Sequence, residues 1–153
     1  MKIKIEMKEL SKLIEQSGKA SQAVYPLTRS ALNKSATKIK YDAKDNSPVA
    51  FGDLKQSINH YVEGLTAKIW AEKPYAVFVE EGTKPHYPPI APLERWARLK
   101  LGSSSLAYAV QKKIGKKGTD AQPFFKPAYE SNIINIEKNF NELADQLIRI
   151  MIS

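Results

Sequence analysis

The sequence contains no cysteine and only two histidines among its 153 residues. The lack of cysteine excludes disulfides, thiol nucleophiles and Cys-ligated zinc. Long apolar runs are lacking too, and a membrane helix needs about 20 consecutive apolar residues. The most apolar region, near the C-terminus, is interrupted by Glu137, Lys138, Glu142, Asp145 and Arg149. Residues 1–6 alternate charged and apolar side chains, unlike a secretory signal. We therefore expect a soluble protein.

Patterns that carry catalysis are also missing. The sequence has no HExxH or GxSxG motif, and no phosphate-binding or dinucleotide-binding glycine pattern. His86, with the adjacent carboxylates Glu80 and Glu81, could supply a base or metal ligands, but no third ligand follows at regular spacing. His60 lies in a predicted strand and is interpreted as structural. We expect no enzyme, no metal site and no cofactor.

Positive charge is abundant but unevenly placed. The formal net charge is +8, and residues 84–126 carry nine basic and only two acidic side chains. Such a segment suits nucleic acid, an acidic protein partner or plain solubility. Candidate contacts with DNA or an acidic partner are Lys112, Lys113, Lys116 and Lys117. A solvated helix end is the simpler alternative, because cations favour the negative pole of a helix.

The pattern of apolar residues predicts alternating elements in a chain of single-domain size. We expect a strand at 2–7, helices at 8–16 and 19–45, and a hairpin with strands near 60–62 and 65–70 that turns at Gly64. Shorter helices are expected at 74–81, 93–101 and 106–114, and a long one at 127–152. The fold class is α+β: one domain over residues 1–153, with a small antiparallel sheet packed against a long N-terminal and a long C-terminal helix.

The last predicted helix has the clearest apolar pattern. Its apolar residues recur at alternating steps of three and four, which makes a heptad-like seam: Ile133, Ile136, Phe140, Leu143, Leu147 and Ile150. The seam either covers the sheet of its own domain or contacts another subunit, since a stripe alone does not identify its partner.

Residues 83–92 contain four prolines, which predicts an extended, exposed loop without regular structure. Long loops inside small domains often make contacts with other molecules. The candidate contacts with a neighbouring subunit or partner are Lys84, Pro85, His86, Tyr87, Pro88 and Pro89.

Three ordered blocks then resemble a known family. They are 46–58 (Asn-Ser-Pro-Val through Phe-Gly-Asp-Leu-Lys-Gln-Ser-Ile), 75–83 (Tyr-Ala-Val-Phe-Val-Glu-Glu-Gly-Thr) and 121–128 (Ala-Gln-Pro-Phe-Phe-Lys-Pro-Ala). The set is similar to the small tail-completion or neck proteins of long-tailed bacteriophages, related to the minor tail protein Z group. Phe51 departs from the small or polar residue usual before the glycine. Residues 84–101 form a fuller insertion than short members carry.

The resemblance implies a structural role in the virion. Such proteins join head to tail or complete the tail, assemble as a homo-oligomeric ring (a hexamer, for example) around the DNA channel, and contact neighbouring neck and tail proteins. The resemblance places the protein in the host cytoplasm during assembly and afterwards at the head–tail junction or upper tail. A soluble basic nucleic-acid-binding protein is the alternative, favoured by charge alone.

Overall fold

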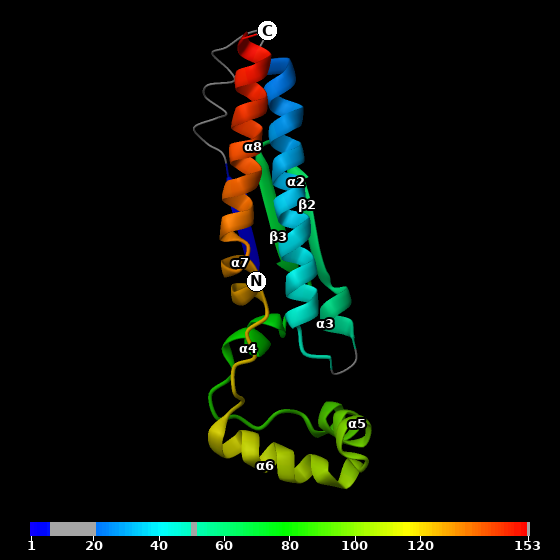
Figure 1. The fold of residues 1–153 in the computed structure, drawn as a ribbon. Helices are drawn as coiled ribbons and strands as arrows, with labels where there is room; N and C mark the ends of the chain where they lie inside the picture. Colours follow the sequence, from blue (N-terminus) through cyan, green and yellow to red (C-terminus); the bar gives the residue numbers. More distant parts are fainter. Residues whose placement is uncertain (7–20, 50–51, 153) are drawn as a thin grey trace.

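The computed structural model describes residues 1–6, 21–49 and 52–152. Two long helices, α2 (Ser21–Asn46) and α8 (Ile133–Ile152), lie side by side and form the upper part of an elongated molecule (Figure 1). A small sheet lies along α2. The helices α5 (Ile90–Leu101) and α6 (Ala107–Lys117) form the opposite end. The predicted α+β class is confirmed, with long helices near both ends of the chain. The predicted helix at 8–16 lies outside the described residues.

The sheet has three antiparallel strands in the order β1-β3-β2. Their bounds are Lys2–Glu6 for β1, Ile58–Glu63 for β2 and Thr66–Ala71 for β3. Ile5 pairs with Ala67, and Val62 pairs with Ala67 from the other side. Gly64 adopts a positive φ in the hairpin turn, where a residue without Cβ is favoured. The predicted first strand and hairpin are confirmed.

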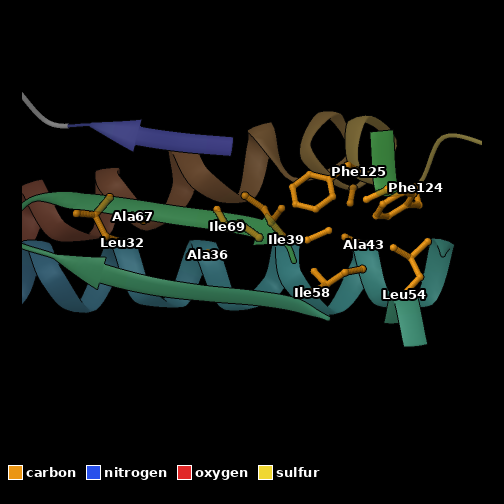
Figure 2. Close-up of a cluster of buried hydrophobic side chains, with 13 residues drawn as sticks. Leu32, Ala36, Ile39, Ala43, Leu54, Ile58, Ala67, Ile69, Phe124 and Phe125 are labelled. Atoms are coloured by element: carbon orange, nitrogen blue, oxygen red, sulfur yellow. The ribbon is translucent and has the colours of Figure 1, made fainter. Parts of the chain in front are cut away.

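The core lies between the sheet and α2 (Figure 2). Leu32 and Ile39 of α2 are fully buried, as is Ile69 of β3. Phe124 and Phe125 close one end of this core, with ring centroids 5.5 Å apart in an edge-to-face arrangement. Fully burying a side chain of this size contributes about 1.5–3 kcal/mol. These two phenylalanines therefore anchor the chain that follows residue 123 to the core.

The predicted last helix is wrong in one respect, because it is two helices. α7 (Phe125–Glu130) ends in a turn, and α8 starts at Ile133. The side chain of Asn132, 1% exposed, donates to the Ala128 carbonyl at 2.8 Å and to the Asp42 carboxylate of α2 at 2.6 Å. The break between α7 and α8 therefore places Asn132 in contact with α2. The local apolar pattern of the sequence does not show this contact, because α2 is distant in the chain.

The seam of α8 faces inward over its middle. Leu143 is buried, and Ile136 and Phe140 pack against the core. Ile133 and Ile150, at its two ends, are 40% and 46% exposed. Most of the seam thus packs within its own chain, as the first alternative expected, but α8 packs mainly on α2 rather than across the sheet.

The boundaries of the shorter elements also need correction. The predicted loop 83–92 ends early, because α5 starts at Ile90 and holds Pro92 in its first turn, where a missing N–H breaks no helical hydrogen bond. The helix predicted at 106–114 continues through Gly115 to Lys117. A short helix, α3 (Asp53–Gln56), was not predicted, whereas α4 (Ala76–Glu81) confirms the helix expected at 74–81.

Candidate partner-binding surface

The two long helices and the sheet, with the short helices beside them, are here called the body. The segment between Thr83 and Thr119 leaves the body and returns to it at one point. The Thr83 N–H donates to the Thr119 carbonyl at 3.0 Å, and the Thr119 N–H donates to the Thr83 carbonyl at 3.2 Å. A Cβ on Gly118 would lie 1.9 Å from the Thr83 carbonyl oxygen, so only glycine permits this approach. Residues 84–118, here called the excursion, therefore form a closed unit at the end of the molecule (Figure 1).

A buried carboxylate fixes the junction beside this closure. Glu80 of α4 is only 6% exposed. One oxygen accepts the backbone N–H groups of Phe124 at 2.8 Å and Phe125 at 2.9 Å, and the other accepts that of Lys126 at 2.8 Å. Unpaired N–H groups at a helix start favour a negative charge there. Glu80 therefore caps α7 and is already engaged by three donors, which argues against the role of general base or metal ligand considered above.

This cap explains why two of the sequence blocks occur together. The block at 75–83 supplies Glu80, and the block at 121–128 supplies the three N–H groups that it accepts. The Val79 carbonyl also accepts the Gln122 N–H at 2.8 Å. Sequence reasoning did not predict this pairing, because the partners are 44 to 46 residues apart. The only sequence cue was the joint presence of both blocks.

The proline-rich loop lies along α6. The His86 N–H donates to the Ile114 carbonyl at 3.3 Å, and the Gln111 side chain donates to the Pro88 carbonyl at 2.8 Å. A Cβ on Gly115 would lie 2.5 Å from the Tyr87 ring, so this glycine makes room for the ring. All six candidate contact residues lie here: Pro88 is partly buried, and Lys84, Pro85, His86, Tyr87 and Pro89 are exposed.

The four candidate lysines all lie on α6. Lys112, Lys113, Lys116 and Lys117, the α6 lysines, are exposed, and this helix contains no acidic residue. Among the described residues none of the four forms an ion pair within 4 Å. Lys116 and Lys117 fall in the last turn, where cations are favoured by the helix dipole. The structure thus gathers the candidate lysines and the candidate loop on the same unit.

An apolar groove of about 960 Å³ separates the body from the excursion. Its lining includes Val49 and Phe78 from the body, which are 56% and 57% exposed, and Trp96 from α5. Tyr75 also lines it. Partial burial and, secondarily, the Asp53 carboxylate raise the pKa of Tyr75 above its ordinary value. Sequence analysis did not predict this groove, since its walls come from four separate segments.

The two histidines lie apart from any cluster of metal-ligand type. Among the described residues, no three His, Asp or Glu side chains are placed to hold an ion. His60 lies between β2 and α2, with its Nε2 at 3.1 Å from both Thr37 Oγ1 and Asn33 Oδ1. Burial and, secondarily, the charge of Lys40 lower the pKa of His60. These contacts agree with the structural interpretation of His60.

The candidate functional features of the described residues are therefore surface features: a basic helix, an exposed loop and an apolar groove. These are features of a protein that associates with other macromolecules. Within the described ranges, no helix is long and apolar enough to cross a membrane.

Comparison with protein-family models is consistent with that class. Residues 11–82, slightly less than half of the chain, match the family described as "Bacteriophage HK97-gp10, putative tail-component". This part of the chain is similar to a phage tail-component family, which agrees with the resemblance found in the sequence. The specific relation to the minor tail protein Z group stays a prediction. No curated protein and no solved structure matches the chain.

Proposed function

We propose that the protein acts in head–tail joining or tail completion of a long-tailed phage or prophage, as a non-enzymatic virion protein. The match of residues 11–82 to a phage tail-component family carries this proposal. The protein assembles as a ring around the DNA channel and contacts neighbouring neck and tail proteins. Its whole chain, residues 1–153, acts as a single structural domain without a cofactor.

The excursion supports the choice of a contact role. The match ends at Gly82, and the excursion starts two residues later. The loop residues 84–89 and the α6 lysines both lie on it, and none of residues 84–118 belongs to the buried cluster between α2 and the sheet. Because the excursion contributes no residue to this described core, its surface can match a binding partner without a loss of core packing.

The test is complementation of a phage or prophage that lacks this gene. Wild-type protein is expected to restore infectious particles, whereas its absence leaves heads and tails unjoined or tails incomplete in electron micrographs. A variant without Lys84–Pro89 is expected to fold, by circular dichroism, but not to complement. Normal particles without the gene would refute the proposed function. Full complementation by the loop deletion would refute only the role of the loop.

A soluble nucleic-acid-binding protein is the second candidate, and the α6 lysines favour it. Phosphate contacts release counterions, so affinity for duplex DNA should then fall steeply with salt. We expect the isolated chain to bind DNA weakly. A steep salt dependence, lost in a Lys112→Glu, Lys116→Glu variant that still complements, would favour the second candidate over the first.

A further inference from the structure

Most of the positive charge of the chain is concentrated in the excursion. Residues 84–118 hold eight of the 24 basic residues and one of the 16 acidic residues, Glu94. The remainder of the chain holds 16 basic and 15 acidic residues, so it is close to neutral. Solubility is served by charges of both signs spread over a surface. A unit of one sign on a nearly neutral body indicates instead a polyanionic partner.

The lysines of this unit gather on one side of α6. At 3.6 residues per turn, Lys112, Lys113 and Lys116 fall within about 100° of one another on the helix surface. They lie opposite Ala107, which is buried, and opposite the face that packs against the proline-rich loop. In Figure 1, α6 lies at the far end of the molecule, and the loop lies between α6 and the body. This side, here called the α6 outer side, therefore faces away from the body.

The composition of the α6 outer side favours nucleic acid over a protein partner. Its three lysines are exposed, and the other residue on this side of the described helix is the small Ala109. Protein–protein interfaces are depleted of lysine and rich in aromatic residues. Contacts with a phosphate backbone are made largely by lysine and arginine, and they need no apolar group. The sequence of α6 contains no carboxylate that would compete with phosphate.

We infer that the α6 outer side binds the phosphate backbone of duplex DNA without sequence preference. Each lysine that neutralises a phosphate releases a counterion, which is the source of the binding free energy. The α6 lysines supply at most four such contacts, so the isolated chain binds weakly at physiological salt and measurably at low salt. In the ring proposed above, this contact turns the excursion toward the DNA channel, and that placement rests on the proposed function.

The salt dependence of DNA binding tests the contact. The full chain is titrated onto a short fluorescently labelled duplex of mixed sequence, and binding is read by fluorescence anisotropy. Four phosphate contacts predict that the affinity falls on the order of 100-fold between about 50 and 200 mM salt. The α6 variant, Lys112→Ala with Lys116→Ala, keeps two contacts, so its affinity should fall on the order of 10-fold over the same range. Alanine has the highest helix propensity, so α6 is preserved, and circular dichroism checks this.

Two control variants separate the contact from net charge. Lys2→Ala with Lys73→Ala removes the same charge from exposed positions outside the excursion, and its salt dependence should equal that of the wild type. Lys112→Arg with Lys116→Arg keeps both cations and should also bind like the wild type.

The inference is overturned if the wild type does not bind the duplex at low salt. It is also overturned if the α6 variant keeps the wild-type salt dependence, or if the control outside the excursion loses as much as the α6 variant. Unchanged DNA binding in the α6 variant, together with a lost complex with a neighbouring tail protein, would assign the α6 lysines to an acidic protein instead.

The complementation assay keeps the DNA contact apart from the proposed function. If the gene is needed for particle completion but the chain does not bind DNA, the contact fails and the proposed function stands. If particles form without the gene while the salt dependence is as expected, the contact stands and the proposed function fails. An α6 variant that loses DNA binding and still completes particles would overturn the placement at the channel.

Discussion

Replacing Glu80 tests the connection between α4 and α7. In Glu80→Ala, the N–H groups of Phe124 and Phe125 lose their acceptor in a buried setting. Each buried donor left unpaired costs about 1–3 kcal/mol. The Lys126 N–H is only partly buried, so water can replace its lost bond. The variant should therefore be destabilised by about 2–6 kcal/mol, a large part of the 5–15 kcal/mol typical of a domain.

Glu80→Gln gives a milder form of the same change. Its single carbonyl oxygen can still accept from Phe124 and Phe125, but its amide group faces the Lys126 N–H, donor against donor. We expect a loss of about 1–2 kcal/mol, which leaves a folded protein for measurement.

Urea unfolding followed by circular dichroism measures both variants. The matched control is Glu81→Ala, which removes the neighbouring carboxylate from an exposed position and should change stability by less than about 0.5 kcal/mol. A loss in Glu80→Ala no larger than in Glu81→Ala would refute the assignment of Glu80 as the cap of α7.

Three further substitutions test other contacts by unfolding. Gly118→Ala should cost about 2 kcal/mol or more, because its Cβ meets the Thr83 carbonyl and its φ is +75°; a cost below about 1 kcal/mol would contradict this crowding. Asn132→Ala should cost about 1–3 kcal/mol, since it leaves the Asp42 carboxylate without a buried donor; an unchanged midpoint would argue against the link. The lowered pKa of His60 means that the unfolded chain takes up a proton first, so stability should fall as pH drops through about 6.5. His60→Gln should flatten that dependence between pH 7.5 and 5.5, and an unaltered slope would exclude His60 as its source.

The sheet and the long helices could be predicted because their patterns are local. Alternation in residues 2–6 and the turn at Gly64 specify β1 and the hairpin without reference to the rest of the chain. The apolar periodicity of α8 likewise predicts its inward face. The break at Asn132 could not be predicted in this way, because its bond to Asp42 joins residues 90 positions apart.

The candidate surface was predictable only in part. The excess of basic residues identified the α6 lysines, and the cluster of prolines identified the loop, since both features can be read from local composition alone. Composition did not show that Tyr87 packs on Gly115, nor that the loop and the lysines share one unit. The groove and the acidic cap needed the tertiary fold, because segments far apart in sequence supply their walls and partners.

The closure at Thr83 and Thr119 makes the excursion separable from the body, and this can be tested directly. The two threonines form an antiparallel bridge with hydrogen bonds in both directions, the geometry that a two-residue Asn-Gly hairpin turn joins. A chain with Asn-Gly in place of residues 84–118 keeps every described residue of the core between α2 and the sheet.

This shortened chain should therefore fold cooperatively, with a stability within about 2 kcal/mol of the wild type, since only loop closure and the groove contacts change. It should fail to self-associate and fail to complement, because the loop and the α6 lysines are gone. An unfolded product would contradict the division into body and excursion. A folded product that still completes particles would show that the body alone makes the contacts with the tail.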